Sequence, residues 1–149
     1  MDNKTTTSQT SQLDQEVHAL RAYASEYSQQ MDFLSQQMRF LESSKYEILM
    51  SIDALNSLED SKQTDNIQTL LNLGGGVSVR ATVTDTTKML VSIGAGITVE
   101  KPIKDAISFL KDRITEIDAS IKRISDSMIK LQNQMAAIEH RMHEIYLKN

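Results

Sequence analysis

The sequence contains no cysteine and no tryptophan, and it has only one proline and five glycines in 149 residues. The absence of cysteine excludes disulfides, thiol nucleophiles and cysteine-based zinc sites. Glycine and proline are the residues that most often interrupt regular structure, so their scarcity predicts long elements. All of them lie between Gly74 and Pro102. This clustering predicts a helix, a short β-rich centre and a second helix, and it argues against a compact α/β enzyme, which needs many turns.

Two further absences limit the expected partners. No stretch approaches about 18 uncharged apolar residues, so we expect no membrane span. Residues 1–12 are mostly Ser, Thr, Gln and Asn, which predicts a disordered polar tail and not a signal peptide. The net charge of -4 gives no electrostatic reason to expect nucleic acid or an anionic membrane surface as a partner.

Two long segments carry apolar residues at alternating spacings of three and four residues. We call these regularly spaced positions the seam. The first seam runs from Leu13 to Leu55, and Lys45 is its only polar residue. The second seam runs from Ile103 to Ile145 and has no polar residue. A mean spacing of 3.5 over about six heptads predicts a left-handed coiled coil. A single polar seam residue commonly fixes the register of the two helices, and we expect this role for Lys45.

Equal seam lengths on either side of a chain reversal favour an antiparallel pair of helices, predicted over residues 13–60 and 102–149. In such a pair, e positions face e positions and g positions face g positions. Oppositely charged residues meet in this alignment, which supports the register. The expected ion pairs are Glu16 with Arg141 and Arg21 with Glu139.

Residues 61–101 contain runs with the period-two alternation of half-buried strands. Glycine clusters at 74–76 and 94–96 divide these runs into two hairpins, because glycine supplies the positive φ of tight turns. Pro102 suits the first position of the second helix, where no N–H is needed. Two hairpins alone bury little surface, so they predict assembly with other chains. The predicted assembly residues are Leu71, Leu73, Val77, Val79, Val83, Met89, Val91, Ile93, Ile97 and Val99.

The free end of the coiled coil is a candidate binding tip, because seam residues there are less covered than in the middle. Methionine adapts to varied apolar partners, and apolar residues off the seam enlarge this surface. The alternative is that these side chains form ordinary coiled-coil core. The candidate tip residues are Leu13, Val17, Leu20, Tyr23, Met135, Ile138, Met142, Ile145, Tyr146 and Leu147. Phe33 and Phe40, one heptad apart at c positions, face either a partner or a cavity.

Signatures of catalysis are missing from the sequence. The glycine clusters lack the Lys-Ser/Thr sequence that completes a phosphate-binding loop. His18, His140 and His143 fall at outer positions of the coiled coil and match no metal-ligand motif. No nucleophile or metalloprotease motif is present. We therefore expect no enzyme activity, no metal and no cofactor.

The order of helix, two hairpins and helix resembles the archaeal-type prefoldin alpha-class subunit over residues 13–147. Residues Leu71 to Gly74 are similar to the entry to that family's first hairpin, with Asn72 where proline is usual. Residues Val91 to Lys101 are similar to its second hairpin and to the entry to its second helix. Two hairpins indicate the alpha class, because beta-class subunits have one.

The resemblance implies an α+β fold, mainly α: a long antiparallel two-helix coiled coil with two central hairpins that contribute to an oligomeric β-barrel. It implies a cytoplasmic, ATP-independent co-chaperone with two alpha and four beta subunits. Its coiled-coil tips would hold unfolded proteins and deliver them to a group II chaperonin, without nucleic-acid or membrane partners. From the residues alone, the alternative is a structural coiled-coil protein that forms filaments or assembly spacers. A membrane tether is disfavoured because the sequence has no basic amphipathic face.

Overall fold

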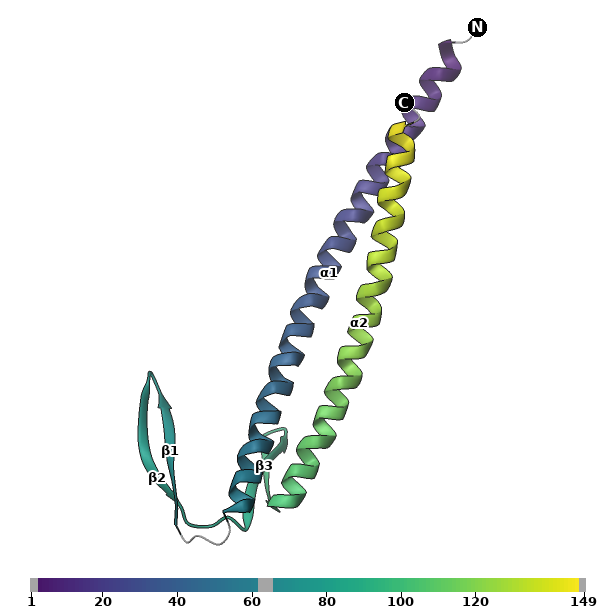
Figure 1. Ribbon diagram of the computed structural model, residues 1–149. Coiled ribbons are helices and arrows are strands. Elements are labelled where there is room, and N and C mark those ends of the chain that lie inside the picture. The colour runs from purple at the N-terminus through teal and green to yellow at the C-terminus, as the bar shows by residue number, and fades with distance from the viewer. Residues whose placement is uncertain (1–2, 62–65, 148–149) are drawn as a thin grey trace. The chain divides into compact units, whose positions relative to one another are not determined.

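The computed structural model describes residues 3–61 and 66–147 and contains two long helices and two hairpins (Figure 1). This architecture confirms the predicted α+β class, in which most residues are helical. The elements are α1 (Asn3–Asp60), β1 (Ile67–Gly74), β2 (Val77–Val83), β3 (Lys88–Gly94), β4 (Ile97–Pro102) and α2 (Ile103–Leu147).

The first helix ends at the predicted residue but begins earlier than predicted. α1 starts at Asn3, whereas the sequence pattern predicted a helix from residue 13 and a disordered tail over 1–12. That prediction is corrected for residues 3–12, while residues 1 and 2 lie outside the described part. Extending a helix that already exists avoids the cost of nucleation, and this segment has no glycine or proline to stop it.

The chain divides into two compact units, each described by itself. The helical unit comprises residues 1–42 and 119–149, and the hairpin unit comprises residues 43–118. In the helical unit, the seam residues of the two helices are buried or half-buried, while most residues on the outer positions are exposed. Leu131, Ile138 and Ile145 are the buried seam residues of this unit. The burial pattern is that of the predicted coiled coil.

The hairpin unit has a small apolar core where the two helices meet the second hairpin. Ile52, Ile103 and Ile107 form this core, and Met89 of β3 packs against it. Lys45 forms an ion pair with Asp118, with 2.6 Å between Nζ and Oδ1. The polar seam residue therefore has a cross-helix partner, as a register-fixing role requires.

The strands form two separate antiparallel sheets, β1 with β2 and β3 with β4. In the first turn Gly75 and Gly76 have φ values of 60° and 79°, which is the pattern of a type I′ hairpin and confirms the predicted use of glycine. Pro102 is the last residue of β4 and pairs with Lys88. The prediction that Pro102 begins the helix is therefore one residue early, because the fixed φ of proline also suits a strand end.

Candidate assembly and binding surfaces

The β1–β2 hairpin presents an apolar face that the described chain leaves open. Ile67 pairs with Val83 and Leu71 pairs with Val79, so these side chains share one face. Leu71 is 53% exposed and Val79 is 44% exposed. Of the other predicted assembly residues, Leu73 and Val77 lie exposed near the turn. Because an isolated hairpin with a solvated apolar face is marginally stable, this surface needs a cover.

Some apolar residues of the β3–β4 hairpin pack against the core of the chain, and others are exposed to solvent. Met89 belongs to the core of the hairpin unit, so this predicted assembly residue is already used within the chain. Val91 pairs with Val99, and both are half-buried. Ile93 and Ile97, near the turn, are 47% and 54% exposed. On the face that carries Val91 and Val99, the exposed apolar part of this hairpin is therefore its turn end.

A pocket of about 430 Å³, open to solvent, lies on the hairpin unit and is lined by α1, β3 and α2. Phe109 contributes to its wall and lies 5.9 Å from Lys101 Nζ and 6.0 Å from Arg113 Cζ, measured from the ring centroid. These two cations flank the aromatic ring, an arrangement that stabilises its position.

Sequence reasoning missed several exposed apolar side chains. Leu70 and Leu90 are 69% and 74% exposed and pair with Arg80 and Glu100 on the mainly polar faces of their hairpins. Strand alternation alone would have identified them as apolar residues on the wrong face. The missed apolar side chains on α1 include Tyr46, Leu49 and Met50, which are exposed and lie outside the seam.

The candidate tip residues all belong to the helical unit but differ in exposure. Ile138 and Ile145 are buried, at 9% and 2% exposure, whereas Tyr23 and Tyr146 are each 54% exposed and Leu147 is 74% exposed. The half-buried members are Leu13, Val17, Leu20, Met135 and Met142. The expectation that seam residues are less covered at this end is wrong for Ile145.

The cover over Ile145 has a structural explanation. α1 continues to Asn3 and extends past the C-terminal end of α2 (Figure 1). The last turn of α2 therefore packs against the body of a helix and not against a frayed end. The open apolar surface of the tip is consequently made by the residues off the seam.

Polar contacts tie the two helices together at the tip. Arg141 donates to both carboxylate oxygens of Glu16, at 2.7 and 3.2 Å, which confirms the predicted pair. Hydrogen bonds from Arg141 to Glu16 and then to Glu144 raise the pKa of the guanidinium above its ordinary value. Arg21 differs from its prediction, because its Nη2 donates a 2.7 Å hydrogen bond to the hydroxyl of Tyr146. Tyr146 lies one heptad from the predicted partner, at the same e position.

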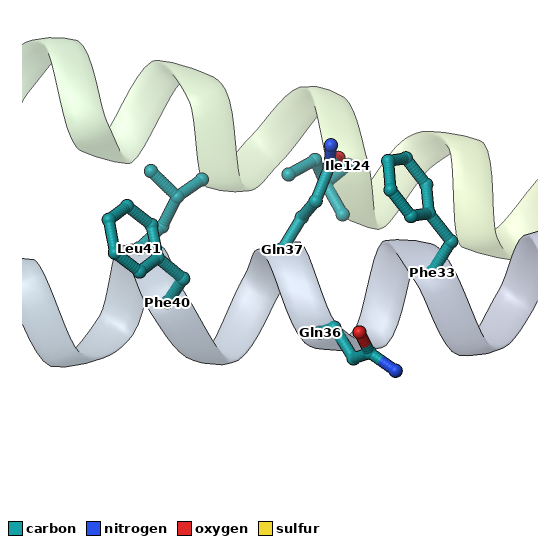
Figure 2. A pocket seen from close by; sticks show the side chains of 6 residues that line it. All are labelled: Phe33, Gln36, Gln37, Phe40, Leu41 and Ile124. Carbon is teal, nitrogen blue, oxygen red and sulfur yellow. The ribbon is translucent and has the colours of Figure 1, made fainter.

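Phe33 and Phe40 line an open groove of about 450 Å³ on the helical unit. The rings are 60% and 71% exposed. Figure 2 shows Gln37 between the two rings along α1, with Ile124 of α2 behind it. The remaining lining residues are Gln36 and Leu41. The two phenylalanines therefore border an outward-facing groove and not an enclosed cavity.

The loop that joins the two hairpins contains an aspartate with a shifted pKa. Asp85, between the hairpins, accepts hydrogen bonds from the hydroxyl and amide of Thr87, which lower its pKa. Within residues 12–61 and 66–147, no three His, Asp or Glu side chains are grouped as a metal site. The described helices also include none that is long and apolar enough to cross a membrane.

Comparison with known proteins places this geometry in a family. The family model for the prefoldin subunit matches residues 27–148. The chain is 58% identical to the prefoldin subunit alpha of Methanocorpusculum labreanum, a match covering 90% of each chain. It is 40% identical to the prefoldin subunit alpha of Methanoregula boonei, over 88% of this chain and 84% of the relative.

A solved structure has the same fold. A chain of the filamentous PFD of Methanocaldococcus jannaschii, determined by cryo-electron microscopy, superposes with a TM-score of 0.56. It covers 86% of this chain and 98% of its own length, at 19% sequence identity. With the matches above, the two helices and two hairpins identify the chain as a member of the prefoldin family of chaperone subunits, of the archaeal alpha type.

Proposed function

We propose that this chaperone subunit captures unfolded proteins at the end of its helical unit and passes them to a group II chaperonin, without using ATP. The observation that carries the proposal is the exposure of three apolar side chains near this end of the helices, Tyr23, Tyr146 and Leu147. These side chains lie off the seam, so they can contact a client while the helices stay paired. Capture then needs neither a nucleotide nor a covalent step, which fits the expectation of a protein that is not an enzyme.

Assembly is the second part of the proposal. The exposed apolar face of β1–β2 and the exposed turn end of β3–β4 would be covered by beta-class subunits, in a hexamer of two alpha and four beta subunits. Two-stranded sheets also leave unpaired strand edges that neighbouring chains can use. The proposed setting is the cytoplasm, where newly made chains are clients.

Weak contacts suffice for this mechanism because several tips act together. Burial of apolar surface contributes about 25 cal/mol per Å², and three side chains offer a small area. Linking several tips in one assembly raises the effective concentration of each tip for a client already held by another. A client is therefore retained while each single contact remains reversible.

The test uses the chain assembled with beta-class subunits and the variant Tyr23→Ser, Tyr146→Ser, Leu147→Ser. We expect most of the suppression of aggregation of a denatured client to be lost, as measured by light scattering, with an unchanged mass of the complex. Ile129→Ser is the matched control, because Ile129 is also an exposed apolar residue of the helical unit, at 52% exposure. Equal suppression by the triple variant and the control would contradict capture by the tip.

The same assay decides the alternative of a filament or spacer protein. Such a protein would not delay aggregation, with or without beta-class subunits. Delivery is measured separately, as transfer of a fluorescent client from the complex to a group II chaperonin. A client that is held but never transferred would contradict delivery and leave capture intact.

A further inference from the structure

A heptad of α1 is repeated almost unchanged. Residues 28–34 read Ser-Gln-Gln-Met-Asp-Phe-Leu and residues 35–41 read Ser-Gln-Gln-Met-Arg-Phe-Leu, so only Asp32 and Arg39 differ. Helix pairing requires apolar residues at the seam, which the Met and Leu of each copy supply. It does not require the same glutamines and phenylalanine outside the seam. The repeat therefore points to a second role for this part of the helix.

Each copy of the heptad lines its own groove on the helical unit. The first groove has a volume of about 510 Å³ and the second about 450 Å³. We call them the paired grooves. They adjoin, because Phe33 lines both, and they are offset by seven residues, which is about 10.5 Å along a helix. The equivalent linings are Gln29, Gln30, Phe33 and Leu34 in the first groove and Gln36, Gln37, Phe40 and Leu41 in the second.

The paired grooves combine apolar rings with side-chain amides. A primary amide offers two donors and one acceptor, which suits the N–H and C=O groups of a peptide main chain. Within the described part of the chain, no hydrogen bond is found for the amides of Gln36 and Gln37. Folded helices and sheets already satisfy their own main-chain groups, whereas an unfolded segment does not. The amides therefore favour an unfolded segment over a partner helix.

The spacing of the grooves also matches an unfolded chain. Polyproline II is a major conformation of unfolded chains, has no internal hydrogen bonds, and repeats every three residues with a rise of about 3.1 Å per residue. Side chains three residues apart then lie on one side at about 9 Å, close to the offset of the paired grooves. In a β-strand, side chains three residues apart point to opposite faces.

A carboxylate marks one end of the paired grooves. Glu26 lines the first groove at the position that Phe33 occupies in the second, one heptad later. One of its oxygens accepts a 3.2 Å hydrogen bond from Gln30. A basic side chain of the bound segment, three residues beyond the apolar residue in the first groove, would approach this carboxylate.

We propose that the paired grooves bind an unfolded segment of a client that carries two large apolar side chains three residues apart and a lysine or arginine three residues beyond one of them. This inference rests on the proposed function for its client, but it assigns a binding site separate from the tip. One apolar side chain occupies each groove, the glutamine amides bind the main chain, and Glu26 faces the cation.

The experiment measures binding of fluorescent peptides to the assembled full-length chain by anisotropy. The matching peptide has the pattern Lys-x-x-Leu-x-x-Leu, and the control peptide has the same composition with its leucines two residues apart. We expect the matching peptide to bind several times more tightly than the control. We expect Phe33→Ser with Phe40→Ser to weaken the matching peptide by about fivefold or more, because two apolar contacts are lost. Glu26→Gln should weaken it by about twofold at low salt.

Controls separate this site from the tip. Ile129→Ser and the triple tip variant should bind the matching peptide as the unchanged chain does, even if the tip variant no longer suppresses aggregation. Equal binding of the two peptides would overturn the proposal, as would unchanged binding by the double phenylalanine variant. Tighter binding of a helical peptide with leucines seven residues apart would overturn it in favour of a partner helix. A larger mass of the unchanged complex, abolished by the double variant, would overturn it in favour of a second copy.

Discussion

The helical unit and the hairpin unit differ in how far the chain itself covers their apolar side chains. In the helical unit the seam is covered by the chain itself, so that Ile145 near the end of α2 is only 2% exposed. In the hairpin unit the first hairpin keeps Leu71 and Val79 about half exposed. The seam of the helix pair is thus covered within one chain, whereas the first hairpin leaves an apolar face exposed to solvent.

Because of this difference, substitutions in the two regions should affect different properties: the stability of the chain in one case and its assembly in the other. Removing a seam or core residue leaves a cavity inside the chain, which costs free energy of unfolding. Removing a residue of the open sheet face costs the isolated chain less, because such a side chain is already about half exposed in the folded state. By our proposal it would cost the complex much more, because the beta-class subunit would lose its apolar contact.

The largest expected effect is on assembly. Leu71→Ser with Val79→Ser should prevent formation of the complex with beta-class subunits, measured as mass by light scattering after chromatography. The helical content of the isolated chain should stay unchanged, because neither residue belongs to the core of the hairpin unit. Gln68→Ser is the matched control on the polar face of the same hairpin. A complex of normal mass would show that this face is not the assembly surface.

The next effect is on the folding of the chain itself. Ile103 is 2% exposed and lies at the centre of the core of the hairpin unit. Ile103→Ala should lower the free energy of unfolding by about 3 kcal/mol, since it removes buried methylene groups and leaves a cavity. Chemical denaturation followed by circular dichroism measures the loss. A loss below about 1 kcal/mol would mean that the core collapses around the smaller side chain.

Sequence reasoning predicted the parts of the fold that periodicity and glycine determine. Heptad spacing located both helices, and the glycines of residues 74–76 and 94–96 located both turns. The start of α1 at Asn3 could not be predicted in this way, because a seam pattern reports only the part of a helix that is paired. Similarly, Met89 fits any half-buried strand, and only the packing of the hairpin shows that the chain's own core uses it.

The binding surfaces were predicted less completely than the fold. Tyr23, Tyr146 and Leu147 were identified from their positions off the seam, and the structure leaves them exposed. Ile138 and Ile145 were expected at the same open tip but are buried, because exposure depends on how far the opposite helix continues. The sequence shows the repeated heptad but not the grooves that its two copies line. Their lining depends on which side chains meet on one face.

The smallest expected effect tests the polar residue within the otherwise apolar seam. Lys45 and Asp118 form a 2.6 Å ion pair with side chains 34% and 48% exposed, so the pair contributes about 1 kcal/mol or less. Lys45→Leu removes the pair, adds apolar contact at the seam and leaves Asp118 accessible to water. We therefore expect the free energy of unfolding to stay the same or rise by about 1 kcal/mol. A loss of more than about 1 kcal/mol would mean that the ion pair itself stabilises the helices.

The cost of Lys45→Leu should appear in the register of the helices. In the natural chain, a shift of one heptad would bury Lys45 against a different neighbour, which disfavours the shifted alignment. In the Lys45→Leu chain the seam is apolar throughout, so the same shift is tolerated. The natural chain has no cysteine, so cysteines introduced by Glu16→Cys and Arg141→Cys can be joined selectively. A short bismaleimide crosslinker is used instead of a direct disulfide, because the native residues meet only through the ends of their long side chains. The crosslink should form less completely in the Lys45→Leu chain than in the chain that keeps Lys45, with all other residues matched. Equal yields would show that the tip alignment does not depend on the polar residue, and that the apolar seam alone selects it.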